Sequence, residues 1–197
     1  MPHVRRERVT RHEAVHVTLK RAAGLPSLRR PRAFALIARI FRAEKADKGF
    51  RLVHFAVRPD HLHLVCEADH TLALSRGVQR IAARLGRGLN ALFARRGRLL
   101  ADRFHARVVR TPRQMRNTLR YVLLNAHKDA RRAGAAPPSG VDPYSSGPWF
   151  DGWRGAPRGA RSSVAARAAP PVTAPRSWLL GAGWRRGGLL DWRDVPG

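Results

Sequence analysis

The chain has 197 residues, enough for one domain with a substantial core, and its composition is strongly basic. Lys and Arg number 39 against 13 for Asp and Glu, a formal net charge of +26. This excess predicts a polyanionic partner, most simply nucleic acid, although GC-rich coding would also raise the arginine content. The single cysteine, Cys66, excludes a disulfide framework and a cysteine-based zinc site. With a polar, basic start and no long apolar run, we expect a cytoplasmic protein without a membrane partner.

The first half of the chain predicts three strands and one helix. Residues 14–20 alternate apolar and polar side chains, which is typical of a strand. A helix is expected from Pro31, with an apolar stripe along one side, and it ends before Gly49. Residues 50–57 form a second expected strand, and an Arg-Pro-Asp turn leads into a third strand over 61–68.

The next elements are a helix, a strand and a helix with clear start signals. Residues 72–95 carry leucines, valine and isoleucine at steps of three and four, which predicts a helix. Residues 103–110 predict a fourth strand, and residues 112–132 a last helix. Thr111, Pro112 and Gln114 form the pattern of a capping box with proline at the first helical position.

The resulting order β-α-β-β-α-β-α predicts an α+β fold. We expect a ferredoxin-like four-stranded antiparallel sheet with helices packed on it. Residues 1–132 form the expected catalytic-type domain. Residues 133–197 are rich in Pro, Gly and Trp and are expected to be a low-complexity tail. Within it, residues 133–175 are expected to be extended or disordered, with a sticky apolar patch at 148–153. Residues 177–193 are expected to form a short helix or an anchor.

Two histidines, His61 and His63, stand one residue apart in the stretch PDHLHLV at 59–65. With the two-residue period of a strand they share one face with Val65, while the leucines between them point to the other face. Two imidazoles directed into one small space are either hydrated at a surface or share a ligand.

The last helix carries a tyrosine that does not fit its apolar stripe. Tyr121 lies ~130° from the centre of the stripe, and Asn125 stands ~40° from Tyr121, one turn further on. Lys128 follows close to the same line. We therefore expect a Tyr-x-x-x-Asn flank, on a helix that lies across the sheet face with the two histidines.

These residues together resemble a known family. Pro-Asp-His-Leu-His-Leu-Val is similar to the His-hydrophobic-His motif of single-tyrosine HUH transposases, which include the IS200-like transposases. The stretch RFHAR at 103–107, followed by the Tyr121–Asn125 helix, is most similar to the REP-associated tyrosine transposases. The resemblance covers about residues 10–132. It implies a metal-dependent endonuclease and strand-transferase that acts on single-stranded or hairpin, repeat-type DNA in the bacterial cytoplasm, associated with the nucleoid.

The resemblance also implies roles for individual residues. Tyr121 would be the nucleophile, forming a 5′-phosphotyrosine and freeing a 3′ hydroxyl. His61, His63 and Asn125 would be the ligands of a divalent metal, Mg²⁺ or Mn²⁺. No water has to be activated, so paired carboxylates are not required. Contacts to DNA phosphates are expected from Arg76, Arg80, Arg87, Arg103, Arg107, Arg110, Arg113, Arg116 and Arg120.

The remaining candidates are assigned mainly to structure. His16, His54 and His105 are expected to line the sheet near the site, and His70 and His127 to face solvent. Tyr144, the other of the two tyrosines, lies in a Pro/Ser/Gly-rich segment that offers no rigid placement.

Two other functions stay open. One is a domesticated, non-catalytic DNA-binding regulator on the same fold, and the other is a basic RNA-binding module. The latter would stack bases on strand aromatics, but alternation puts Phe50 and Phe55 on opposite faces. The joint presence of the two histidines, the tyrosine and the asparagine favours the enzyme. Whether the protein is a monomer or a homodimer is left undecided.

Overall fold

The computed structural model describes residues 7–44, 49–136, 138–155 and 169–194. Its elements confirm the expected α+β class and the order of the first seven elements. No helix in this described part is long and apolar enough to cross a membrane. The elements are β1 (Ala14–Lys20), α1 (Pro31–Ala43), β2 (Phe50–Val57), β3 (His61–Ala68), α2 (Thr71–Leu92), β4 (His105–Val109), α3 (Pro112–Arg132), η2 (Gly147–Trp149), α5 (Trp178–Gly181) and η3 (Gly183–Gly187).

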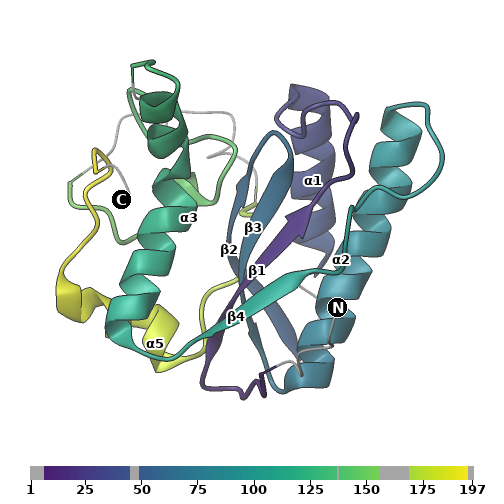
Figure 1. The fold of residues 1–197 in the computed structure, drawn as a ribbon. Helices are drawn as coiled ribbons and strands as arrows, with labels where there is room; N and C mark the ends of the chain where they lie inside the picture. The colour runs from purple at the N-terminus through teal and green to yellow at the C-terminus, as the bar shows by residue number, and fades with distance from the viewer. Residues whose placement is uncertain (1–6, 45–48, 137, 156–168, 195–197) are drawn as a thin grey trace.

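The four strands form one antiparallel sheet in the order β2-β3-β1-β4. This is the order of a ferredoxin-like sheet, with the first strand in the middle, so the predicted topology is confirmed. Helices α1 and α2 cover one face of the sheet, and α3 lies on the opposite face (Figure 1). The sheet is therefore buried on both sides, and each strand has to supply two different apolar surfaces.

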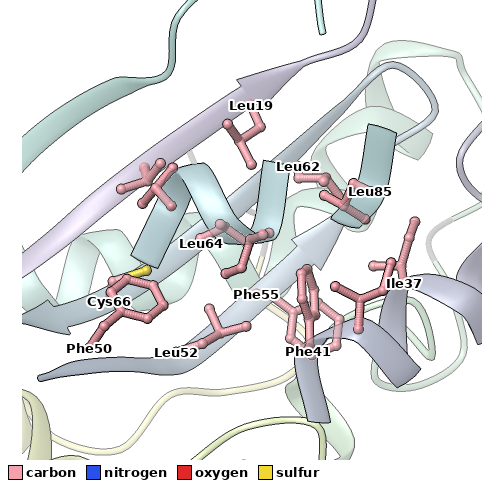
Figure 2. Close-up of a cluster of buried hydrophobic side chains, with 14 of the residues drawn as sticks. Leu19, Ile37, Phe41, Phe50, Leu52, Phe55, Leu62, Leu64, Cys66 and Leu85 are labelled. Carbon is pink, nitrogen blue, oxygen red and sulfur yellow. The ribbon is translucent and has the colours of Figure 1, made fainter. Parts of the chain in front are cut away.

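The larger core lies between the sheet and the α1–α2 layer. Leu19 of β1 and Leu64 of β3 point into it, as their alternation predicts, and Ile37, Phe41 and Leu85 meet them from the helices (Figure 2). All five side chains are almost completely buried. Since alternate residues of β1 and β3 are committed to this core, the residues between them must face α3.

A β-bulge in β2 corrects one prediction about the aromatic residues. The pairing of β2 with β3 shifts register between Leu52 and His54, which inserts one residue into the alternation. Phe50 and Phe55 consequently lie on the same side, in the α1–α2 core, at 1% and 0% exposure. The expectation that they face opposite sides was wrong, and their burial leaves no ring face for base stacking.

Helix α3 begins with the predicted capping box. The Thr111 hydroxyl accepts a hydrogen bond from the backbone N–H of Gln114 at 3.2 Å, and the Gln114 side chain accepts one from the N–H of Thr111 at 3.4 Å. Met115, Leu119 and Val122 are buried in a second apolar cluster. Cap and stripe together fix where the helix starts and which side it buries.

The C-terminal region forms a further layer over α3. Phe150, Trp153, Trp184 and Leu190 are buried in the same cluster as the α3 stripe, and the Trp153 indole donates a hydrogen bond to the Gly147 carbonyl at 2.9 Å. The expectation that residues 133–175 are extended or disordered was therefore wrong for the segment that holds Phe150 and Trp153. The division of the chain at residue 132 stays a prediction, and the contacts across it are extensive.

Removal of a buried C-terminal tryptophan should destabilise the whole fold. Trp184 is 1% exposed, so Trp184→Ala leaves a large cavity beside α3 and should lower the free energy of unfolding by ~3–5 kcal/mol in urea denaturation. The matched control is Trp178→Ala, because Trp178 is 55% exposed on the neighbouring α5. It should cost less than about 1 kcal/mol. Equal costs for the two variants would contradict the C-terminal layer as part of the core.

Candidate active site

The candidate site lies on the sheet face that α3 covers. The register of β1 with β3 places Thr18 opposite His63 and His16 opposite Val65, and all four residues point away from the α1–α2 core. On the other side of β1, the register with β4 places Arg107 opposite His16. Three strands therefore present polar side chains on one face of an otherwise apolar sheet.

The structure brings the two histidines and the tyrosine together. The Nε2 atoms of His61 and His63 lie 2.9 Å apart, and their rings are nearly perpendicular at 84°. The ring of Tyr121 lies above them, with centroids 5.1 Å from His63 and 6.0 Å from His16. Helix α3 thus lies across the histidine face with its tyrosine directed at the pair, although the expectation for it came from the helical wheel alone.

The outer nitrogens of the two histidines are held by neighbouring polar groups. Asp60 Oδ1 lies 2.7 Å from Nδ1 of His61 and accepts a hydrogen bond from it. Nδ1 of His63 lies 3.1 Å from Nε2 of His16 and 3.4 Å from the Thr18 hydroxyl. Such contacts fix ring orientation and leave the opposite nitrogen, Nε2, for a ligand. The sequence suggested only that His16 lines the sheet near the site. In the structure His16 also contacts His63 directly.

The protonation states suit a ligand-binding pair. Burial lowers the pKa of His63 to about 3, helped by the charges of His16, His61 and Arg58. Burial likewise lowers the pKa of His16 to about 4, with Arg107 acting in the same direction. Burial, the largest single cause, would raise the pKa of Asp60, but the hydrogen bond to His61, the charges of His61 and Arg21 and a backbone hydrogen bond together lower it. At neutral pH, His16 and His63 are neutral and Asp60 is a carboxylate.

The donor set of this pair fits a divalent cation. Two bare imidazole nitrogens that face each other repel, whereas two nitrogens ~2.1 Å from one ion and at a right angle around it are ~3 Å apart. The observed 2.9 Å matches that arrangement. Among the described residues no group of three His, Cys, Asp or Glu side chains is placed to ligate a metal.

Asn125, the third metal ligand expected from the sequence, is a neutral side chain on α3. It lies one turn beyond Tyr121 and is 5% exposed, so it is not the ordinary surface amide of a helix flank. No hydrogen bond joins its carboxamide to either histidine in the part of the chain that the structure describes. Lys128 continues the flank, with Nζ 5.9 Å from the Tyr121 ring centroid.

Arg58 belongs to this site, and the sequence analysis missed it. It precedes the Pro59–Asp60 turn, is only 3% exposed, and forms an ion pair with Asp129 of α3. Burial lowers the pKa of its guanidinium, as does the charge of Arg29, while Asp142, Tyr121 and Asp60 raise it. In a chain with many arginines nothing in the local sequence marks this one as buried.

Comparisons with known proteins agree with the geometry. Residues 15–123, more than half of the chain, match the protein family described as "Transposase IS200 like". The chain belongs to the IS200-like transposase family. A solved structure described as a REP-associated tyrosine transposase bound to a REP hairpin has the same fold, with a TM-score of 0.57 and 15% sequence identity over 74% of this chain and 82% of that one. No curated protein matches the chain.

The predicted arginines of this transposase divide into three groups by position. Those on α2 lie on the sheet face opposite the histidines, and Arg80 is bound to Glu44 at 3.0 Å. Two in the first half of α3 hold the C-terminal layer, because Arg116 donates to the Gly188 carbonyl at 3.2 Å and Arg120 pairs with Asp194 at 3.4 Å. The α2 group is Arg76, Arg80 and Arg87.

The third group surrounds β4 and the start of α3. Arg103, Arg107 and Arg113 are exposed there, and Arg110 is exposed but paired with Glu7 and Glu13, each at 3.1 Å. Of the nine arginines named from the sequence, the structure brings Arg107 nearest to the candidate site, since its charge acts on His16.

Three other sequence-based placements change. His127 is buried at 1% exposure, so the expectation that it faces solvent was wrong. His54 lies against Phe150 of the C-terminal layer, at a ring distance of 5.4 Å. Tyr144 is fixed in place: its ring packs on Phe34 at 4.9 Å, in the core on the α1–α2 face, and it is thus separated from the histidines by the sheet.

Metal binding by the transposase can be measured without any DNA. We expect Mn²⁺ to bind the unchanged protein, as followed by the electron paramagnetic resonance signal of free Mn²⁺, and His61→Ala or His63→Ala to abolish this binding. Asp60→Asn should weaken it about 10- to 100-fold, because the carboxylate orients His61. The control is His12→Ala, an exposed histidine before β1, which should bind normally. Full binding in both His61 and His63 variants would refute the metal site.

Proposed function

We propose that this chain is a metal-dependent endonuclease and strand-transferase for single-stranded DNA that acts through a 5′-phosphotyrosine on Tyr121. The observation that carries the proposal is the convergence of His61 and His63 at 2.9 Å beneath the ring of Tyr121. A hairpin DNA substrate is supported by the REP hairpin bound to the transposase of similar fold. Such a substrate places the protein in the cytoplasm, at the nucleoid.

The reaction needs one nucleophile and no activated water. The Tyr121 oxygen forms a bond to the phosphorus, the bond from phosphorus to the 3′ oxygen breaks, and the phenol proton is lost while the 3′ oxygen gains one. The DNA 5′ end stays attached to the tyrosine. Attack by a 3′ hydroxyl on this phosphotyrosine reverses the bond changes and joins strands, which gives transfer without an external energy source.

His61 and His63, with Asn125 as third ligand, would hold Mg²⁺ or Mn²⁺. When bound, the metal would draw charge from the phosphoryl oxygens and orient the phosphodiester. The chain itself supplies the orientation of the ligands, through Asp60 on His61 and through His16 and Thr18 on His63. The capped and doubly packed α3 supplies a fixed position for the tyrosine hydroxyl, which in-line attack requires.

Binding of the DNA would depend on the exposed basic surface beside the site. Arg103, Arg107 and Arg113 are the exposed arginines nearest to β4 and the start of α3. Each contact to a phosphate releases counterions, so binding should weaken steeply with salt. A surface of this kind holds a strand of any sequence, and sequence choice has to come from other contacts.

The assignment of Tyr121 as the nucleophile can be tested by removing its one phenol oxygen atom. Tyr121→Phe changes packing little, so the variant should fold and bind Mn²⁺ and a labelled hairpin with a single-stranded flank within about threefold of the unchanged protein. It should form no covalent adduct with the DNA on a denaturing gel and release no cleaved strand. The unchanged protein should form the adduct only with metal, and mass spectrometry should place it on Tyr121.

Tyr144→Phe is the matched control, because Tyr144 is the only other tyrosine and lies on the far side of the sheet. It should cleave as the unchanged protein does. An adduct on Tyr144, or one that persists in Tyr121→Phe, would overturn the assignment. Tight hairpin binding with no adduct in the unchanged protein at any metal concentration would favour a non-catalytic regulator instead.

A further inference from the structure

We propose that Arg58 binds the scissile phosphate of the DNA, and that Asp129 serves as its counter-ion only while no DNA is bound. The inference rests on the proposed function, since it names a further residue for the same site. It goes beyond the ligands and the nucleophile because Arg58 belongs to neither group.

The position of Arg58 connects the two elements that carry the chemistry. Its backbone N–H donates to the carbonyl of His61 at 2.8 Å, so it is fixed to the start of β3. Its guanidinium crosses to α3 and pairs with Asp129. Tyr121, Asn125 and Asp129 are spaced by four residues and therefore follow one flank of α3. The guanidinium thus lies in the space between the histidine strand and the tyrosine flank.

The charge of Arg58 acts on both sides of that space. It interacts electrostatically with the hydroxyl of Tyr121, and it opposes protonation of His63. The side chain is 4% exposed, whereas other arginines near the site, such as Arg107, are exposed. A cation so placed is one of the few groups that can reach a phosphate held between Tyr121 and the histidine pair.

A buried guanidinium needs a negative charge beside it at all times, because desolvation without compensation is costly. Three carboxylates are candidates, Asp60, Asp129 and Asp142. Asp60 is held by His61, whose Nδ1 lies 2.7 Å from it. Asp142 is not available, since Arg29 holds it with two hydrogen bonds of 2.8 and 2.9 Å. Asp129 is the partner, and its side chain is 47% exposed, so it can turn into water at little cost when another anion takes its place.

A phosphodiester is suited to this exchange. It carries one negative charge, as Asp129 does, and two non-bridging oxygens that match the planar fork of a guanidinium. Charge on these oxygens increases as the tyrosine attacks, so a guanidinium at that point stabilises the transition state more than the bound strand. Arg58 therefore should affect the rate of cleavage more than the affinity for the hairpin.

The alternative is a purely structural ion pair. The two roles predict opposite effects of Asp129→Asn on cleavage and on DNA binding. In a structural pair, loss of either partner removes the same contact, so Arg58→Gln and Asp129→Asn should be equally harmful. If Asp129 only competes with the phosphate, Asp129→Asn should leave cleavage intact or faster and tighten DNA binding a few-fold. Arg58→Gln should slow cleavage about 100-fold.

The experiment uses the full chain with a labelled hairpin that carries a single-stranded flank. Single-turnover cleavage is measured at saturating DNA with Mn²⁺, affinity is measured in EDTA, and the melting temperature of each variant is recorded. We expect Arg58→Gln to lose cleavage rate while its affinity for the hairpin stays within about threefold of the unchanged protein. Arg58→Lys should recover part of the rate, because lysine keeps the charge but lacks the planar fork of the guanidinium. Asp129→Asn should keep the full rate. The control pair is Arg185→Gln and Asp151→Asn, an ion pair of 2.9 Å in the C-terminal layer, for which no change in rate is expected.

Equal loss of rate in Arg58→Gln and Asp129→Asn would overturn the proposal, as would a normal rate in Arg58→Gln. If Arg58→Gln does not fold, Arg58→Lys and Asp129→Asn decide the question by the same criteria. If the unchanged protein forms no adduct, the proposed function fails separately. The Arg58 proposal is then judged from affinity in EDTA, where it requires binding a few-fold tighter in Asp129→Asn and no tighter binding in Arg58→Gln.

Discussion

The pairing register of β1 with β3 is the constraint on which the candidate site depends. It places Thr18 opposite His63 and brings His16 within 3.1 Å of the same imidazole. A slip of one residue would turn both histidines of β3 into the α1–α2 core and bring leucines to the site face. That core fixes the register, because Val17 and Leu64 fit it and the imidazoles do not. The apolar face of the sheet thus positions the polar face.

Helix α3 is held from two sides, which sets its rotation as well as its place. Met115, Leu119 and Val122 belong to a cluster that also contains Trp153 and Trp184 of the C-terminal layer. A helix packed only against the sheet could rotate by part of a turn at modest cost, whereas a helix between two apolar layers loses contacts on one side or the other. The direction of Tyr121 therefore depends on Trp153 and Trp184, which lie far beyond it in the chain.

Local patterns in the sequence were sufficient for the fold and for half of the site. Alternation in β1 and β3, the stripe of α3 and its capping box are nearest-neighbour signals, and they placed the histidines and the tyrosine correctly. The same alternation places His16 on the histidine face, so its contact with His63 could have been predicted from the sequence but was not. Burial of Arg58 and Trp184 was not readable, because it arises from contacts between distant segments that leave no period in the sequence. The bulge in β2, which moves Phe55 to the other face, could not be predicted from the alternation either.

The charge of the chain explains why one arginine differs from the others. With 39 Lys and Arg against 13 Asp and Glu, pairing every carboxylate with one base still leaves the net charge of +26 uncompensated. At the surface this excess is tolerated, because water and salt screen it. A buried guanidinium has no such solvent and must have a specific anion within contact. Arg58 has Asp129, whose carboxylate is shared between the protein interior and water. In the proposed exchange one anion would replace another at that position, so a phosphate could bind without first creating an unpaired buried charge.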